Sequence, residues 1–465
     1  MSTVPSELPP ERWVFANRTL NLRGVQAIGY DMDYTLIHYR ADEWERAAFE
    51  HARTVLARRG WPVEQLVFEP DQFTIGLVCD LELGNLLKAT RFGYVSRSRH
   101  GNSMLPFEQQ RKIYQDTVVE LSEPRYEFMN TFFELSRASL WTQLVEIHDR
   151  HPLDGAGSYA DLYRAVDDAL TETHAAGALK VDIVADPDRF VELDPDIVQT
   201  LVDQRAAGKQ LLLITNSEWA YADRMMRHCI DPFCVDGETW RDLFDIVIVS
   251  AAKPSFFSEP NPVYRVVDEE QSLLRPHEGP LEPGHVYFGG NARMVEESLG
   301  AAGHPLYFGD HLFGDVHVAK NEYRWRTALI VRELEDEIID AVAFADDQET
   351  LERLMTDKTE ADRTQARLRL AGQSSSDEFA ELTAAAVELD RQIAPLARAA
   401  SDLGNPTWGP LMRAGNDKSL FARQVERYAD VYTSRVSNMR YETPYAYLRA
   451  ARGSLPHDAA GRSRR

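Results

Sequence analysis

The stretch Val25-Gln26-Ala27-Ile28-Gly29-Tyr30-Asp31-Met32-Asp33-Tyr34-Thr35 joins a short apolar run to two carboxylates at its end. This pattern is typical of a buried parallel strand that delivers its last residues to a ligand crevice. Asp31 and Asp33 can project into one crevice, where they suit a nucleophile and a general acid/base around a shared cation. The alternative is helix capping, which we expect for Asp186-Pro187-Asp188 and Asp194-Pro195-Asp196.

Similar apolar runs recur along the chain, and helical patterns separate them. The runs span residues 210–215, 244–250, 285–288, 305–310 and 326–331. Strands that alternate with helices predict an α/β fold with a doubly wound parallel sheet. About 180 residues separate the first run from the second, which is too long for an ordinary crossover connection, so we expect an inserted domain there.

These patterns predict three parts of the chain. The catalytic core is discontinuous and covers residues 15–40 and 200–345, the inserted domain covers 41–199, and a helical C-terminal extension with a tail covers 346–465. Within the insertion, long helical patterns run near 105–149 and 158–176. The Ala-, Glu- and Arg-rich region 347–400 is typical of paired helices or a coiled arm.

Charge and composition narrow the class of protein. The chain has 465 residues, with 51 Lys or Arg against 74 Asp or Glu, so its formal net charge is −23. This charge disfavours a nucleic-acid backbone or an anionic membrane as the main partner because both repel an acidic protein. The N-terminal sequence lacks the pattern of a secretory leader, and no apolar run approaches the length of a membrane span. We therefore expect a soluble cytoplasmic protein.

Chemically useful residues also follow three of the other predicted strands. Thr215-Asn216-Ser217 stands after the second run and just ahead of a helix, where hydroxyls and amides favour a phosphate oxygen; plain capping by Ser217 is the alternative. Lys253 follows the third run and can neutralise phosphate, although such a lysine is often a solvated loop charge. Asp310 ends the run 305–310 and completes an oxygen-only cation site that suits Mg²⁺.

In this order, the Asp pair, Thr215, Lys253 and Gly309-Asp310-His311-Leu312-Phe313-Gly314-Asp315 resemble the haloacid dehalogenase superfamily of phosphohydrolases. More narrowly, the chain resembles the cytosolic purine 5′-nucleotidase family, whose members prefer IMP and GMP. Further matches are Gly84-Asn85-Leu86-Leu87-Lys88, Lys253-Pro254-Ser255-Phe256-Phe257 and the tyrosine-rich stretch 421–432. The resemblance implies a haloacid dehalogenase-like sheet with a large inserted cap and a helical C-terminal extension.

The resemblance also implies roles for the residues at the strand ends. Asp31 would be the nucleophile that forms an aspartyl-phosphate, and Asp33 would be the general acid and base. Mg²⁺ would lie between Asp31, the backbone carbonyl of Asp33 and Asp310, with Asp315 in support of Lys253 or the metal waters. The residues that would hold the phosphoryl oxygens are Thr215, Asn216, Ser217 and Lys253.

The inserted domain would act as a cap that excludes water and reads the base. Phe133 matches a family aromatic that stacks on the purine, although ordinary helix core explains its spacing equally well. Lys180 matches a family lysine near the nucleotide. Arg164 and Asp168 have the i, i+4 spacing of the family pair that holds the purine edge, whereas an ungapped alignment puts Asp167 and Thr171 there.

Family members are homo-oligomers that adenine nucleotides activate at a separate site. The residues that match this effector site are Asn130, Gln424, Arg427 and Tyr428. Arg427 and Tyr428 can equally be packing residues of a helical interface. We therefore expect a homodimer or homotetramer that binds a nucleoside monophosphate and neither nucleic acid nor a membrane.

The function that this resemblance implies is Mg²⁺-dependent 5′-nucleotidase activity on purine nucleoside 5′-monophosphates, with IMP and GMP preferred. Transfer of the phosphoryl group to a nucleoside is a natural corollary. One alternative is a phosphatase of another small phosphate ester. The other is a nucleotide-sensing module without catalysis, which predicts the loss of at least one core residue, yet all of them are present.

Overall fold

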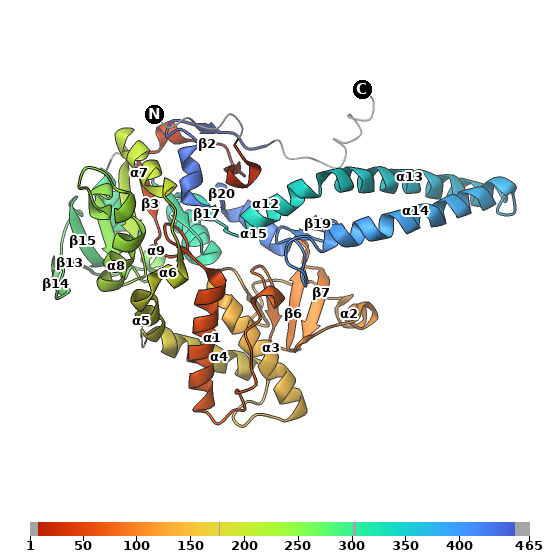
Figure 1. The fold of residues 1–465 in the computed structure, drawn as a ribbon, viewed down its shortest axis with the longest axis horizontal. Coiled ribbons are helices and arrows are strands. Elements are labelled where there is room, and N and C mark those ends of the chain that lie inside the picture. The colour runs from red at the N-terminus through yellow and green to blue at the C-terminus, as the bar shows by residue number, and fades with distance from the viewer. Residues whose placement is uncertain (1–7, 176, 301–303, 452–465) are drawn as a thin grey trace.

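A ten-stranded sheet forms the centre of the protein in the computed structural model, which describes residues 8–175, 177–300 and 304–451 (Figure 1). Its order is β1-β20-β17-β16-β3-β11-β12-β15-β13-β14, and the seven strands from β20 to β15 are parallel. The six strands that the sequence predicts are β3 (Ala27–Tyr30), β11 (Gln210–Ile214), β12 (Ile246–Val249), β15 (His285–Gly289), β16 (Leu306–Gly309) and β17 (Arg326–Ile330). The predicted α/β class with a parallel-rich sheet is confirmed.

Short helices connect these strands. They are α7 (Asp196–Ala206), α8 (Trp219–Cys229), α9 (Ser255–Ser258), α10 (Ala292–Leu299) and α11 (Val318–Tyr323). Every residue of β3, β12 and β16 is buried. The central strands are apolar along their whole length because both faces of the sheet are buried. At one edge, β13 (Val263–Asp268) and β14 (Leu273–Pro276) add an antiparallel hairpin.

The opposite edge of the sheet comes from the two ends of the chain. β20 (Val431–Thr433) lies parallel to β17, and β1 (Phe15–Ala16) pairs antiparallel with β20. Within the region 346–465, for which we expect a helical extension with a tail, residues 431–433 belong to the main sheet. A three-residue strand has too short a pattern to be recognised, and only pairing with the distant strands β17 and β1 makes it a strand.

The inserted segment leaves the core and returns to it at neighbouring points. β4 (His38–Tyr39) and β10 (Val191–Glu192) pair antiparallel and mark the two crossings. Between them lie α1 (Ala41–Ala57), α3 (Leu135–Arg150), α4 (Tyr159–Ala175), α5 (Ala178–Ala185) and α6 (Pro187–Phe190). In Figure 1, α1, α3 and α4 pack together below the main sheet.

A second sheet stands inside the inserted segment. Its strands are, in spatial order, β8 (Ser103–Met104), β7 (Val95–His100), β6 (Asn85–Ala89), β5 (Val78–Asp80) and β9 (Tyr126–Phe128). The helical pattern near 105–149 is broken accordingly, since α2 (Phe107–Tyr114) ends early and β9 precedes α3. Pairing of β9 with β5 overrides the local helical pattern there.

The region 347–400, for which the sequence predicts paired helices, contains α13 (Ala345–Leu370) and α14 (Asp377–Ser401). These two helices follow α12 (Leu334–Ala343). The two long helices lie side by side and project away from the sheet (Figure 1). Leu351 and Leu354, early in α13, and Ile393, late in α14, form a buried cluster between the two helices. Among the described residues, no helix is both long enough and apolar enough to cross a membrane.

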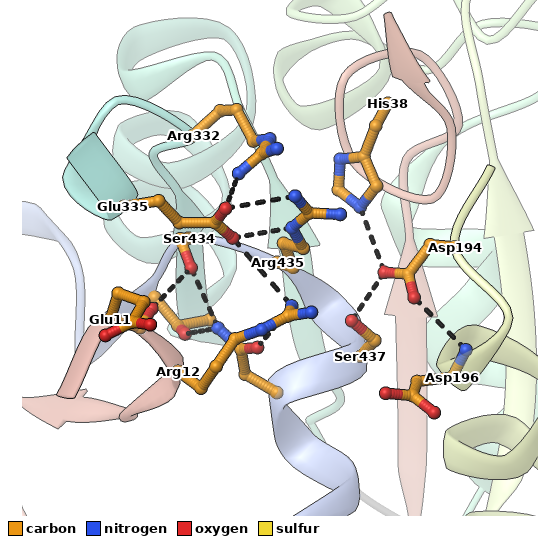
Figure 2. Close-up of polar contacts among 12 residues, drawn as sticks. Glu11, Arg12, His38, Asp194, Asp196, Arg332, Glu335, Ser434, Arg435 and Ser437 are labelled. Atoms are coloured by element: carbon orange, nitrogen blue, oxygen red, sulfur yellow. Dashed lines mark hydrogen bonds and ion pairs between the residues drawn. The ribbon is translucent and has the colours of Figure 1, made fainter. Parts of the chain in front are cut away.

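A buried charge network ties both ends of the chain to the core (Figure 2). The guanidinium of Arg435 donates to Glu335 over 2.5 Å and to Glu192, beside β4, over 2.7 Å. Arg12, near the N-terminus, lies 3.8 Å from Glu335 and donates to Asn438 over 3.1 Å. The side chains of Arg435 and Glu335 are only 9% and 12% exposed, so these charges depend on each other for compensation.

We predict that Arg435→Met lowers the free energy of unfolding by about 2 kcal/mol, because Glu335 loses two charge-assisted hydrogen bonds and keeps only Arg332 and Arg12 as partners. Urea unfolding followed by circular dichroism measures the change. Arg391→Met is the matched control, since Arg391 pairs with Glu388 on the exposed surface of α14 and its loss is expected to leave the unfolding midpoint unchanged. Equal midpoints for both variants would contradict the role of the network.

Candidate active site

Four neighbouring strands deliver the predicted site residues to one edge of the main sheet. Asp31 directly follows β3, Thr215 follows β11, Lys253 follows β12 and Asp310 follows β16. The strands β16, β3, β11 and β12 are adjacent and parallel, so their carboxyl ends meet at the same edge. This edge is where parallel α/β sheets bind ligands.

The ammonium of Lys253 lies at the centre of the site. Its Nζ is 2.8 Å from Oδ1 of Asp31 and 2.8 Å from Oδ1 of Asp315, and it donates to the hydroxyl of Tyr307 over 3.0 Å. Only 4% of the Lys253 side chain is exposed. Burial alone would lower the pKa of Lys253, but Asp31 and Asp315 outweigh it and raise this pKa well above its usual value. The lysine is therefore charged.

Three buried carboxylates crowd around this single ammonium. One oxygen from each of Asp31, Asp310 and Asp315 lies within 4.8 Å of the others. Burial, followed by the charges of Asp315 and Asp31, raises the pKa of Asp310 well above its usual value. Burial raises the pKa of Asp31 to about 7, although Lys253 opposes this shift. Three carboxylates against one ammonium favour an additional cation, and an all-oxygen donor set fits Mg²⁺.

Asp33 is not one of the three grouped carboxylates and has other partners. Its Oδ1 accepts a hydrogen bond from the hydroxyl of Tyr39 over 2.6 Å, and its Oδ2 accepts one from Oγ of Ser217 over 2.7 Å. Burial raises the pKa of Asp33, and these two hydrogen bonds lower it in part. The carboxylate of Asp33 is thus separated from the acid cluster that its neighbour Asp31 joins, which allows the two residues different roles.

The segment after β11 is tied to the segment after β12. The side-chain amide of Asn216 accepts from the backbone N–H of Lys253 over 2.6 Å and donates to its carbonyl over 3.0 Å. Ser250 and Ala252 adopt left-handed φ values of 47° and 57°, which are strained for residues other than glycine. Thr215 is fully buried, and its hydroxyl accepts from the backbone N–H of Ser217 over 3.0 Å.

The end of β16 needs a glycine. A Cβ on Gly309 would lie 2.6 Å from the Cβ of Asp315, far inside contact distance. Gly309 therefore lets Asp315 fold back beside Asp310 and reach Lys253. The hydroxyl of Thr131, from the inserted segment, donates to Oδ2 of Asp310 over 3.1 Å and brings that segment against the same edge.

Two of the predicted cap residues lie beside Asp33 and its partners. The half-buried ring of Phe133 packs edge-on against Tyr34, with centroids 4.9 Å apart, and 5.4 Å from Trp44. The ammonium of Lys180 bonds Glu218 over 2.7 Å and stands 4.8 Å from the ring centroid of Tyr221. No described contact joins either residue to the acid cluster directly.

Arg164 and Asp168 are not brought to this edge by any described contact. Arg164 pairs with Asp161, Asp168 pairs with Arg59 over 3.3 Å, and their side chains are 74% and 70% exposed. The neighbouring Asp167 instead pairs with Arg137 over 2.8 Å. On α4, Asp167, one of the two residues from the ungapped alignment, therefore pairs with a half-buried arginine, and the predicted pair does not.

The four predicted effector residues lie around or near Phe313, in the segment that joins Asp310 to Asp315. Oδ1 of Asn130 accepts from the backbone N–H of Phe313 over 3.4 Å, and the ring of Tyr428 lies edge-on to Phe313 at 6.1 Å. The guanidinium of Arg427 stands over the ring of Tyr428. Gln424 is buried on the same helix, α15 (Leu420–Tyr428).

Sequence reasoning assigned no role to Tyr39, Tyr307 or Thr131, although all three contact the central residues. Of the three, only Tyr39 could have been suggested from the sequence, because it belongs to the short segment that follows Asp33. Tyr307 is a strand residue whose inward direction depends on the register of β16, and Thr131 reaches Asp310 across a separation of 179 residues.

The protein thus has an α/β fold with a buried cluster of three aspartates and one lysine at the carboxyl edge of its parallel sheet. This arrangement is suited to binding phosphate and a divalent cation. A model of the 5' nucleotidase family matches residues 14–460, so the chain belongs to this family. The match confirms the predicted family and the predicted enzyme class, 5′-nucleotidase, a phosphoric monoester hydrolase.

Two relatives match nearly the whole chain. The 5′-nucleotidase domain-containing protein 2 of Homo sapiens is 29% identical over 480 residues, which cover 97% of this chain and 87% of that protein. The protein of the same name from Rattus norvegicus is 28% identical, with coverages of 97% and 82%. Among solved structures, an archaeal β-phosphoglucomutase from a Pyrococcus strain covers 66% of this chain at 10% identity, but its TM-score of 0.29 supports no functional argument.

We predict that Mg²⁺ stabilises the wild-type protein through the aspartate cluster. At about 100 times its dissociation constant, a ligand adds about 2.7 kcal/mol to the free energy of unfolding. Asp310→Asn is expected to lose most of this gain, which thermal unfolding with and without MgCl₂ measures. Asp188→Asn, at a side chain 82% exposed, is the control that retains it. The same gain in both variants would contradict a cation site at Asp310.

Proposed function

We propose that this chain is an Mg²⁺-dependent 5′-nucleotidase that hydrolyses nucleoside 5′-monophosphates, with IMP and GMP preferred, through an aspartyl-phosphate on Asp31. One observation carries the proposal: Lys253 pairs with Asp31 and Asp315 beside Asp310 at the carboxyl edge of the parallel sheet. The proposed fold type is haloacid dehalogenase-like and doubly wound.

In the first step, a carboxylate oxygen of Asp31 attacks phosphorus and forms an acyl-phosphate bond. The bond between phosphorus and the ribose oxygen breaks, and protonated Asp33 gives its proton to that oxygen as it leaves. In the second step, Asp33 takes a proton from water as the water attacks phosphorus. The acyl-phosphate bond then breaks, which releases phosphate and regenerates Asp31.

The remaining core residues neutralise and orient the phosphoryl group. Lys253 offsets negative charge, and Thr215 and Asn216 are the proposed donors to phosphoryl oxygens. The hydroxyl of Ser217 donates to Asp33, so Ser217 would contact a phosphoryl oxygen only by giving up that hydrogen bond. The proposed metal ligands are Asp31, the backbone carbonyl of Asp33 and Asp310, and the nearby Asp315 joins this donor set. When bound, Mg²⁺ would offset the charge that develops on the phosphoryl oxygens.

The inserted segment 41–199 is the proposed cap over the core formed by residues 15–40 and 200–345. Contact between Thr131 and Asp310 supports this role, because it brings the segment against the catalytic edge. Phe133 and Lys180 are the proposed contacts to the nucleotide, and Asp167 with Arg137 takes the place of the exposed Arg164 and Asp168 as candidates for the purine edge.

The same proposal includes the location, the oligomeric state, a transfer activity and the regulation of the protein. These are a cytoplasmic location, a homodimer or homotetramer, phosphoryl transfer to nucleosides, and an adenine-nucleotide effector site at Asn130, Gln424, Arg427 and Tyr428. Contacts of Asn130 and Tyr428 with Phe313 support the effector site, because Phe313 lies between Asp310 and Asp315. A phosphatase of another small ester is the second candidate, which the exposed positions of Arg164 and Asp168 favour.

We predict phosphate release from IMP or GMP that stops when Mg²⁺ is chelated and falls by about three orders of magnitude or more in Asp31→Asn, because the nucleophile is lost. The assay compares IMP, GMP, AMP, CMP and a sugar phosphate. Release from the sugar phosphate alone would favour the second candidate, and no release from any ester would contradict hydrolysis and favour a sensing role.

We also predict that Phe133→Leu raises the KM for purine monophosphates about fivefold, because aromatic stacking contributes about 1 kcal/mol. The kcat for these substrates and both constants for a sugar phosphate are expected to stay within about twofold. Steady-state kinetics measure the difference. Equal losses with both substrates would indicate that Phe133 is only a packing residue against Tyr34 and Trp44.

A further inference from the structure

The carboxylate of Asp33 is held at both of its oxygens. Tyr39 donates to Oδ1 over 2.6 Å and Ser217 donates to Oδ2 over 2.7 Å. Both distances are typical of strong O–H···O hydrogen bonds to a carboxylate. Two donors at opposite oxygens prevent free rotation of the carboxylate about its Cβ–Cγ bond. The orientation of Asp33 is thus decided by its neighbours before any substrate binds.

Tyr39 is itself fixed by side chains from three other elements. It is buried, and its hydroxyl lies 3.0 Å from that of Tyr221 on α8. Its ring meets those of Trp44 and Tyr34 edge-on, with centroids 4.5 Å and 5.3 Å apart. Lys180 in turn covers the ring of Tyr221. The hydroxyl of Tyr39 therefore has little freedom to leave Asp33.

The backbone of Tyr39 is anchored on the other side of its strand. Successive side chains of a strand point to opposite faces, so His38 points away from Asp33, and its Nε2 lies 3.5 Å from Oδ2 of Asp194. Asp194 also accepts from Oγ of Ser437 over 2.5 Å. Figure 2 shows His38, Asp194 and Ser437 beside the cluster around Arg435. The first crossing strand of the inserted segment is thereby bound to the buried charge network.

We propose that Tyr39 is a positioning residue that orients the Asp33 carboxylate for proton transfer to the leaving oxygen. The proposal rests on the proposed function, in which Asp33 is the general acid. Tyr39 gives up no proton in this role; its hydrogen bond to Oδ1 holds the carboxylate in one orientation. Since Tyr39 belongs to β4, the entry strand of the inserted segment also supports the chemistry.

Dependence on the leaving group tests this role. A nucleoside leaves as an alcohol and needs a proton, whereas p-nitrophenolate leaves without one. The readout is kcat/KM, which includes only the steps up to departure of the leaving group. Tyr39→Phe is expected to lower kcat/KM about tenfold for the nucleoside monophosphate that the wild type hydrolyses fastest, and less than about twofold for p-nitrophenyl phosphate.

Two further variants separate positioning from folding. Tyr114→Phe removes another buried hydroxyl, which donates to Asp80 over 2.9 Å in the inserted sheet, and it is expected to change neither activity. Tyr221→Phe removes the neighbour of the Tyr39 hydroxyl but leaves Tyr39 in place, and a smaller loss with the same preference is expected. If thermal unfolding shows that Tyr39→Phe is not folded, the kcat/KM values of Tyr221→Phe decide whether the positioning role holds.

Equal losses of kcat/KM for the two substrates, or no loss in Tyr39→Phe, would overturn the positioning role while the proposed function stands. If the wild type hydrolyses p-nitrophenyl phosphate but no nucleoside monophosphate, the alkyl phosphate that it hydrolyses fastest replaces the nucleoside monophosphate in the test. Tyr39→Phe is then expected to show the same tenfold loss of kcat/KM for that alkyl phosphate. A wild type inactive toward every monoester would overturn the proposed function and the positioning role together.

Discussion

The ammonium of Lys253, held 2.8 Å from both Asp31 and Asp315, is the interaction on which the rest of the site depends. Buried charges are costly unless they are paired, and here one cation serves carboxylates from two strand ends. The surrounding structure supplies what the pairing needs. Asn216 fixes the backbone of Lys253 through two hydrogen bonds, and the absence of a Cβ on Gly309 lets Asp315 approach.

The cluster has one cation for three carboxylates, and this charge imbalance is the basis of the proposed metal site. Burial raises the pKa of both Asp31 and Asp310, and the charge of the neighbouring Asp315 raises both further. A divalent cation would relieve the repulsion, and a phosphoryl group would then enter a site whose charges are already arranged. Asp33 lies outside this group of three, and its two carboxylate oxygens accept hydrogen bonds from Tyr39 and Ser217 instead. Two aspartates two residues apart thus have different surroundings.

The inserted segment is coupled to this edge at both of its sides. β4 and β10 pair where the segment leaves and re-enters the core, and the network around Arg435 binds this junction to the two ends of the chain. Thr131 reaches Asp310 from the middle of the segment. Any movement of the segment relative to the sheet would therefore act on Asp33 through Tyr39 and on Asp310 through Thr131.

The sequence by itself determined the six central strands and the positions of Asp31, Thr215, Lys253 and Asp310, because a run of apolar residues followed by a polar one is a local pattern that survives folding. Only the tertiary structure decided that β20 joins the sheet, that Arg164 and Asp168 stay exposed, and that Tyr39 reaches Asp33. Those outcomes depend on strand register, on helix rotation and on contacts between distant segments. Since none of these is encoded in a short stretch of residues, they follow only from the packing of the whole chain.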